Sequence, residues 1–278
     1  MEEMKTVFED VFIPNVTFEL IPIKDLVNNQ EYQRNLSIKH IERAAAHFDI
    51  YQVNPVKVSR RDGKNYVVNG QHTMEIIAKV SGSRDTPVWC MVYDGLVYQH
   101  EADIFANQQK YVKSLTTYEI FLANIEAGSD KHLLIKDLVE SYMLKLGALG
   151  APGCICGVNA LEYIYDKHGY EILSRTLRIL VAVWEGDQQS LCSNMLKGLA
   201  KVFATYDTRI NDDMLIEKLS RVSPKVIIRN AKDRRSGPMG FAEAIVLVYN
   251  SKLRNGLSIE DLYAHTSSKL PSYSEKVQ

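Results

Sequence analysis

The sequence has little of several features that would mark a specialised class of protein. Its 278 residues contain only four cysteines, too few for the dense disulfide framework of a small secreted domain. No apolar run approaches the roughly 20 residues of a membrane helix; the longest, 179–184 and 244–249, have six residues each. The stretch from Met1 to Lys5 is acidic and lacks the apolar core of a secretion signal. We therefore expect a cytoplasmic protein with no membrane partner.

An excess of charge of either sign is also absent, because 33 Lys and Arg residues balance 34 Asp and Glu residues. Any binding of a nucleic acid must then come from a local basic patch. Hydrophobic residues at 46% and charged residues at 24% are typical of folded globular chains. The charge is uneven along the chain, with 13 basic and 17 acidic residues before Gly128 and 20 basic and 17 acidic residues after it. Together with the length, this change predicts two domains, 1–128 and 129–278.

The first domain alternates strand and helix patterns. Residues 16–21 and 88–93 are rich in β-forming residues, and Ser37 is a good cap for an amphipathic helix that runs to Phe48. The strands 56–58 and 66–68 flank an Asp62-Gly63 turn signal and predict a hairpin. A helical pattern follows His72, and another extends from His100 to about residue 110. This order predicts a small α/β unit.

The second domain has the helical period almost throughout. Helices are predicted over 119–127, 130–144, 160–168, 171–184, 191–203, 212–222, 225–235 and 241–253, with a glycine-rich loop at 147–157. Trp184 and the tyrosines at 163, 165 and 170 are spaced as core aromatics, with stacking on nucleic-acid bases as the alternative. The predicted class is α+β, a small α/β N-terminal domain followed by a mostly helical C-terminal domain.

The segment Asn69-Gly70-Gln71-His72 joins a predicted strand to a predicted helix. Backbone N–H groups at such a helix start favour anions, and glycine permits a tight turn and the close approach of a ligand. His72 can donate a hydrogen bond or exchange a proton near neutral pH, and Gln71 offers both donors and an acceptor. The alternative is that Gly70 only makes the turn while Gln71 and His72 cap the helix.

The wider pattern resembles the ParB/sulfiredoxin fold, and more narrowly the ParB N-terminal-like nuclease domains of phages, plasmids and other mobile elements. The resemblance spans roughly residues 15–128. It rests on Tyr32-Gln33-Arg34, the helix after Ser37, Asn54-Pro55-Val56-Lys57-Val58, the segment from Asp62 to His72, and Ala106-Asn107-Gln108-Gln109-Lys110.

This resemblance implies a phosphate-binding cleft. Its first motif would be Gly70, Gln71, His72 and Thr73, and its second would be Asn107, Gln109 and Lys110. Arg34 would either close over the same cleft or pair with a carboxylate such as that of Glu31. A nucleoside triphosphate with Mg²⁺ is the implied ligand, and His72 is the candidate catalytic residue of a nuclease or nucleotidase.

The sequence departs from this family at several positions. Partition ParB proteins carry Gly-Glu-Arg-Arg at the turn, whereas this chain lacks both arginines that would grip a triphosphate. Ala106 stands where an acidic residue would help to hold magnesium, and Lys110 replaces an arginine. No dense cluster of carboxylates and histidines appears, so we predict no metal site. Sulfiredoxin chemistry needs a cysteine beside the glycine of the turn, where this chain has Gln71 and His72.

A basic segment lies in the second domain. Its seven cations are Lys218, Arg221, Lys225, Arg229, Lys232, Arg234 and Arg235. Lys225, Arg229 and Lys232 recur at spacings of four and three, on one face of a helix that starts at Pro224. Such a stripe could bind nucleic-acid phosphates, or it could be an ordinary solvated helix face. The pair of helices 212–222 and 225–235 is the best candidate for a helix-turn-helix.

Two functions fit these patterns. In the first, a mobile-element protein binds a nucleotide or nucleic-acid phosphate in the cleft, and its helical half binds DNA, RNA or a partner, with nuclease activity as one option. In the second, the cleft has decayed, and the chain is a non-catalytic interaction protein that inhibits or recruits a host factor, such as a component of a bacterial defence system. The missing arginines and Ala106 favour the second, whereas the retained Gly70, His72 and Asn107 favour the first. A homodimer is compatible with either.

Overall fold

A computed structural model describes residues 16–28, 31–108, 110, 112–147 and 150–264. Its contacts divide the chain into two compact units, Met1–Lys113 and Ser114–Gln278. The predicted boundary after residue 128 falls later than this division. The difference arises because helix α5 (Thr117–Glu126) packs against α6 and α7 through the buried Phe121, and so belongs with the helical unit.

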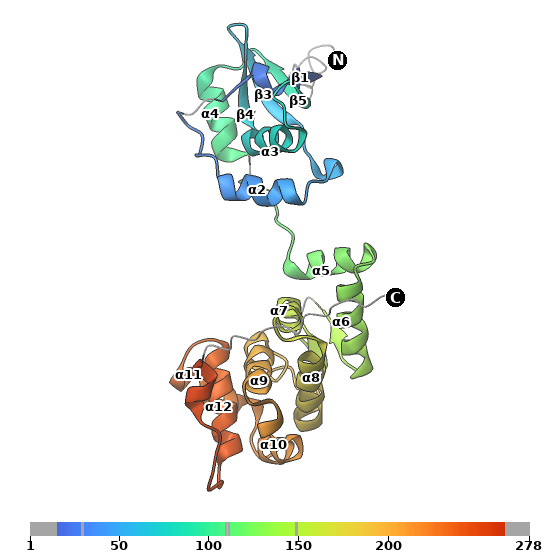
Figure 1. The fold of residues 1–278 in the computed structure, drawn as a ribbon, viewed down its shortest axis with the longest axis vertical. Helices are drawn as coiled ribbons and strands as arrows, with labels where there is room; N and C mark the ends of the chain where they lie inside the picture. Colours follow the sequence, from blue (N-terminus) through green and yellow to red (C-terminus); the bar gives the residue numbers. More distant parts are fainter. Residues whose placement is uncertain (1–15, 29–30, 109, 111, 148–149, 265–278) are drawn as a thin grey trace, which may run out of the picture. The chain divides into compact units, whose positions relative to one another are not determined.

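The first unit is built on a five-stranded sheet (Figure 1). Its strands are β1 (Val16–Pro22), β2 (Leu26–Asn28), β3 (Val56–Arg61), β4 (Lys64–Asn69) and β5 (Pro87–Asp94), in the order β1-β5-β3-β4-β2. β3 and β4 form the predicted hairpin, β5 runs parallel to β3, and β1 pairs antiparallel with β5. The hairpin turn has positive φ at Asp62 (51°) and Gly63 (70°), as a two-residue type I′ turn requires. The short strand β2 was not predicted.

Three helices complete this unit, α2 (Ile38–Ala46), α3 (Gln71–Ser81) and α4 (Tyr98–Asn107), with short 3₁₀ turns at Ile23–Asp25 and Ile50–Gln52. The Ser37 hydroxyl caps α2 as predicted, accepting from the His40 N–H. α3 inserts Met74 into the core of the sheet, between valines of β3 and β4. α4 is tied to the hairpin by an ion pair, in which Arg61 Nε lies 2.7 Å from Oε1 of the fully buried Glu101.

The second unit is helical apart from a two-stranded pair, β6 (Lys145–Leu146) and β7 (Cys154–Ile155). Besides α5, its helices are α6 (Asp130–Ser141), α7 (Val158–His168), α8 (Tyr170–Trp184), α9 (Ser193–Tyr206), α10 (Asp212–Leu219), α11 (Pro224–Arg234) and α12 (Pro238–Asn250), with 3₁₀ turns at Asp207–Arg209 and Ile259–Tyr263. α9 lies between α12 and α8 and carries the centre of the core (Figure 1). Gly198 on α9 permits this packing, because a Cβ there would lie 2.6 Å from Phe241 Cβ on α12.

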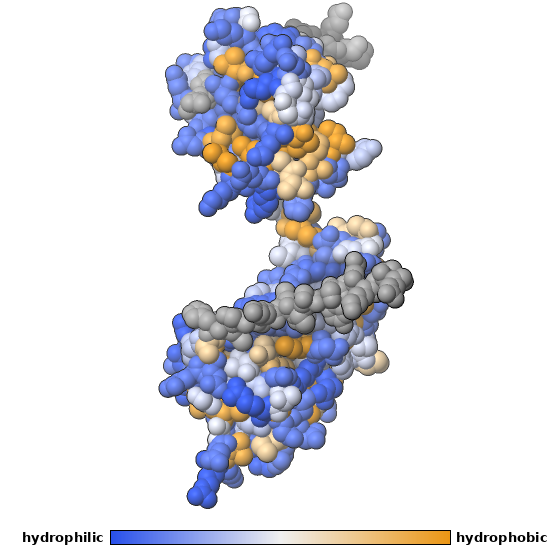
Figure 2. Space-filling model, in the orientation of Figure 1, coloured by the Kyte–Doolittle hydropathy of each residue, from blue (hydrophilic) through white to orange (hydrophobic). Residues whose placement is uncertain are grey.

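The α+β class predicted from the sequence is confirmed by this arrangement. None of the described helices is long and apolar enough to cross a membrane. On the face drawn in Figure 2, hydrophobic side chains gather on the first unit around α3. Ile77 and Val80 of α3 line a cavity of about 370 Å³ there, together with Phe48, Ile50 and Trp89.

Candidate functional site

The turn from β4 into α3 is shaped by Gly70. This residue has φ +104° and ψ 14°, and a Cβ at its position would lie 3.2 Å from the Cα of the buried Val56. Only glycine therefore fits the turn without strain. The first helical hydrogen bond runs from Met74 N–H to Gly70 O, so the backbone N–H groups of Gln71, His72 and Thr73 have no acceptor within the helix. They form the positive end of α3.

Gln71 fastens the segment before α2 to this turn. Its amide Nε2 donates to the carbonyl oxygen of Arg34 at 2.8 Å, and its side chain is buried. Arg34 is thereby held beside the start of α3. Among the described residues its guanidinium makes no ion pair, so the predicted alternative of a pair with Glu31 is not observed. The positive charge of Arg34 therefore remains available to a ligand at the start of α3.

His72 bridges the same two segments. Its Nε2 accepts a hydrogen bond from the backbone N–H of Ser37 at 3.1 Å, so the neutral ring carries its proton on Nδ1. Partial burial lowers the pKa of His72 below its usual value, and the nearby positive charge of Arg34 and the ring of His40 lower it further. The basic nitrogen is occupied in this arrangement. The role of His72 as a candidate catalytic residue stays a prediction; in the structure its Nδ1–H is a hydrogen-bond donor.

These groups line one cavity of about 400 Å³ in the first unit. Five predicted residues line it: Arg34, Gly70, Gln71, His72 and Thr73. The end of α4 closes it through Phe105, Ala106 and Gln108, which are sequence neighbours of the second predicted motif and not its predicted members. The remaining wall comes from Gln33, His40, Val68 and Asn69.

The second predicted motif contributes through different residues from those expected. The Asn107 amide donates to Oδ1 of Asp103 at 2.8 Å, one turn back on α4, and is not part of the cavity wall. Lys110 also lies outside the wall, and its backbone N–H donates to Asn107 O. Gln109 lies outside the described residues. Gln108, between them in sequence, is the residue that reaches the cavity.

Two glutamines that sequence reasoning did not single out complete the wall. The side-chain oxygens Oε1 of Gln33 and Gln108 are buried and have no hydrogen-bond partner among the residues that the structure describes. The amide orientation of Gln33 is fixed, because its Nε2 donates to Val67 O. Buried unpaired acceptors are costly, by about 1–3 kcal/mol each. Both residues line the cavity, and these two oxygens are covered by neighbouring atoms.

The cavity does not fit a magnesium ion held by the protein. No carboxylate is among its lining residues, and the described part of the chain contains no group of three or more His, Cys, Asp or Glu side chains placed to hold a metal. Glu101 is bound to Arg61, and Glu75 pairs with Arg84 at 2.9 Å. No hydrolytic step follows from these residues.

Cys90 is fully buried in the sheet, where desolvation raises the pKa of its thiol to about 11.

The seven predicted cations of the helical unit divide into two groups. Four are used within the fold: Lys218 donates to the carbonyl oxygens of Tyr249 and Ser251, Arg221 pairs with Glu217, Arg234 pairs with Glu243, and Arg235 lies over the ring of Tyr263. These contacts hold helices and their ends. The predicted helix-turn-helix is not supported, because α11 packs mainly on α12, while α10 packs on α8 and α12.

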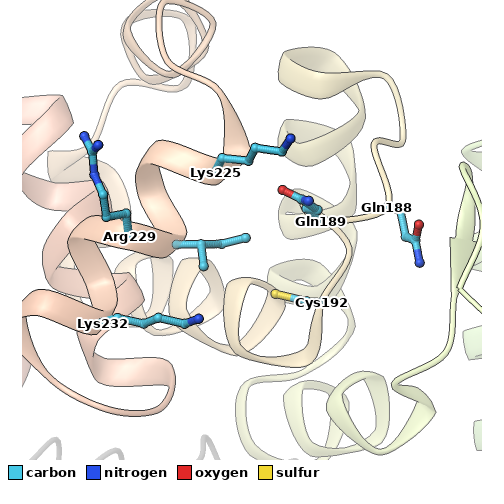
Figure 3. A pocket seen from close by; sticks show the side chains of 7 residues that line it. Gln188, Gln189, Cys192, Lys225, Arg229 and Lys232 are labelled. Carbon is cyan, nitrogen blue, oxygen red and sulfur yellow. The ribbon is translucent and has the colours of Figure 1, made fainter.

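The other three cations line a groove of about 640 Å³. Lys225, Arg229 and Lys232 come from α11 and make no ion pair within the described residues. Lys225 and Lys232 extend toward Gln189 and Cys192, at the start of α9, whereas Arg229 is directed elsewhere (Figure 3). Of the predicted basic patch, these three side chains are the ones without an ion-pair partner among the described residues.

Comparisons with known proteins show the family of this chain. No curated protein matches the sequence. One similar solved structure is the C-terminally truncated chromosome-partitioning protein ParB from Caulobacter crescentus complexed with CTP-gamma-S, with 13% identity over 83% of this chain and 99% of that chain and a TM-score of 0.36. Another is the same protein complexed to the centromeric parS site, with 11% identity over 83% and 98% and a TM-score of 0.22. Residues 27–261 match the sequence model of a family of unknown function, DUF6551, and this match covers most of the chain. The protein therefore belongs to the DUF6551 family.

Proposed function

We propose that the first unit binds a mononucleotide in the cavity at the start of α3. The observation that carries the proposal is that Arg34, His72 and the first residues of α3 line one cavity that has no carboxylate in its wall. A helix start with an adjacent arginine suits a phosphate group. The volume of about 400 Å³ falls in the range of small-ligand sites.

The glutamine oxygens extend the proposal to the base. Oε1 of Gln33 and of Gln108 are buried without a partner among the described residues, and a turn of either side chain toward the cavity would let that oxygen accept from the exocyclic amine of a nucleobase. The ring of Phe105 lies in the same wall and offers an apolar face to a base. The role is one of binding, and it requires no catalytic side chain.

A second function concerns the helical unit, which we propose binds nucleic acid along the groove of α11. The observation that favours it is the set of three cations, Lys225, Arg229 and Lys232, that the fold leaves without acidic partners in the described residues. Unpaired cations along one helix face suit a row of phosphates. The resemblance of the first domain to ParB-like domains of mobile elements makes a phage or plasmid protein part of this proposal.

Calorimetry with nucleoside monophosphates and triphosphates, with and without Mg²⁺, tests the nucleotide site. Arg34→Gln should weaken binding by roughly 10- to 150-fold, because charge-assisted hydrogen bonds contribute about 1.5–3 kcal/mol. Arg43→Gln removes the same charge from α2 outside the cavity wall and should leave the affinity unchanged. Equal losses in the two variants would refute the site.

Fluorescence anisotropy with labelled 20-nucleotide DNA and RNA across a salt series tests the groove. Lys225→Gln/Lys232→Gln should reduce the slope of log K against log salt by about 1.4 for single strands, at about 0.7 for each lost phosphate contact. An unchanged slope would refute the groove. If neither nucleotide nor nucleic acid binds, the result favours the non-catalytic interaction protein that inhibits or recruits a host factor.

A further inference from the structure

A second cationic surface of the helical unit lies where α7 packs against α9. Tyr163 and Lys167 are one turn apart on α7, and Lys197 and Lys201 are one turn apart on α9. Tyr163 was expected in the core but is 41% exposed. It lies outside the apolar stripe of α7, because Leu161 and Ile164 fill that stripe.

The side chains of this surface contact one another. Lys167 Nζ donates to the Tyr163 hydroxyl at 2.8 Å, and Lys197 Nζ lies 4.9 Å from the centre of the Tyr163 ring. The ring of His168 approaches the same tyrosine edge to face, with ring centres 6.3 Å apart. Two ammonium groups and an imidazole therefore lie against one exposed aromatic ring.

The acidic residues of α7 do not neutralise this cluster. Glu162 Oε1 accepts a hydrogen bond from His132 Nε2 at 3.0 Å, and Asp166 pairs with Lys131 at 2.8 Å, so both carboxyl groups are engaged with α6. Within the described residues, neither Lys197 nor Lys201 makes an ion pair. Burial lowers the pKa of Lys201, and the charge of Lys167 lowers it further. Burial and the same two lysines likewise lower the pKa of His168.

We propose that Lys167, Lys197 and Lys201 bind successive phosphates of a nucleic-acid strand, at a site separate from the groove of α11. The inference rests on the proposed nucleic-acid role of the helical unit and adds a second contact surface to it. Lysines one turn apart along a helix form a row, which matches a chain of phosphates better than a single small anion. The exposed Tyr163 ring adds a platform on which a base can stack.

The first experiment measures salt dependence on the full chain with a labelled 20-nucleotide single strand. Lys197→Gln/Lys201→Gln should lower the slope of log K against log salt by about 1.4. Lys131→Gln/Lys136→Gln removes two lysines that already lie beside carboxylates and should leave the slope unchanged. Lys225→Gln/Lys232→Gln tests the α11 groove separately, so the proposal for one surface can be refuted while the proposal for the other stands. An unchanged slope for the α7–α9 variant, or no binding by the wild type, overturns the inference.

The second experiment needs no substitution. Lysines of the wild-type chain are acetylated with an N-hydroxysuccinimide ester and quantified by mass spectrometry. The oligonucleotide should protect Lys167, Lys197 and Lys201 several-fold, and should leave Lys136 unprotected. Inorganic tripolyphosphate distinguishes the source of the phosphate. Protection by tripolyphosphate alone would overturn the assignment to nucleic acid, and equal acetylation with and without the oligonucleotide would overturn the site.

Discussion

Replacing Gly70 by alanine tests the geometry on which the nucleotide site depends. A residue with a Cβ at φ +104° is strained by about 1–3 kcal/mol. The new Cβ would also lie 3.2 Å from both the Cα and a methyl group of Val56, which is 1% exposed and has little room to move. We expect a total loss of stability of about 2–4 kcal/mol for the first unit.

Gly82→Ala is the matched control, since Gly82 ends the helix that Gly70 begins. Its φ is also positive, at +73°, but nothing lies within 4 Å of an added Cβ. This variant should lose about 1–2 kcal/mol of stability, because only the strain of a Cβ at positive φ acts on it.

Hydrogen-exchange mass spectrometry on the full chain separates the two units, because each is read from its own peptides. In peptides from β3 and β4, Gly70→Ala should speed exchange by roughly 30- to 1,000-fold, since each 1.4 kcal/mol corresponds to about tenfold. Gly82→Ala should speed it by roughly 5- to 30-fold. Equal effects of the two substitutions would show that contact with Val56 does not restrict the turn, and would refute the reasoning.

Three further predictions use the same readout. His72→Gln carries an acceptor that reaches the position of Nε2 and should leave exchange in the first unit nearly unchanged, whereas the amide oxygen of His72→Asn is one methylene too short to reach the Ser37 N–H and this variant should cost about 0.5–1.5 kcal/mol. Because the folded pKa of His72 is lowered, protonation favours unfolding; the first unit should lose stability as the pH falls below about 6.5, and less so in His72→Gln. Asp212→Asn, which weakens the pairing with Arg175 and Arg178, should destabilise the helical unit by about 1–3 kcal/mol, measured in peptides of α8 and α10.

Local sequence signals predicted most elements of the fold. The Asp62-Gly63 turn, the Ser37 cap and the 3.6-residue periods of the second half each depend on neighbouring residues, so they can be read from the chain alone. The strand β2 is three residues long and is defined by its pairing with β4, which no local pattern reveals. The predicted domain boundary lies later than the observed division because α5 belongs to the helical unit through the packing of Phe121, which is a long-range contact.

The candidate site was predictable in its backbone and less so in its side chains. Gly70 carried a local signal, since a glycine between a strand and a helix indicates a special turn. The use of Gln108 rather than Asn107 depends on where α4 ends and on which side chain its last turn directs inward. The unpaired oxygen of Gln33 depends on its bond to Val67, which lies 34 residues away. Such features require coordinates.

The placement of Lys218 has a practical consequence for mutagenesis. Its ammonium group binds the carbonyl oxygens at the end of α12, and its charge is thus part of the scaffold. A charge-reversal scan scored only by retention on a DNA column would rank Lys218 alongside Lys225. The Lys218 variant would lose retention because the end of α12 loosens, and the Lys225 variant because a contact with the nucleic acid is lost. Scans of this surface need a folding measurement for every variant before any lysine is assigned to recognition.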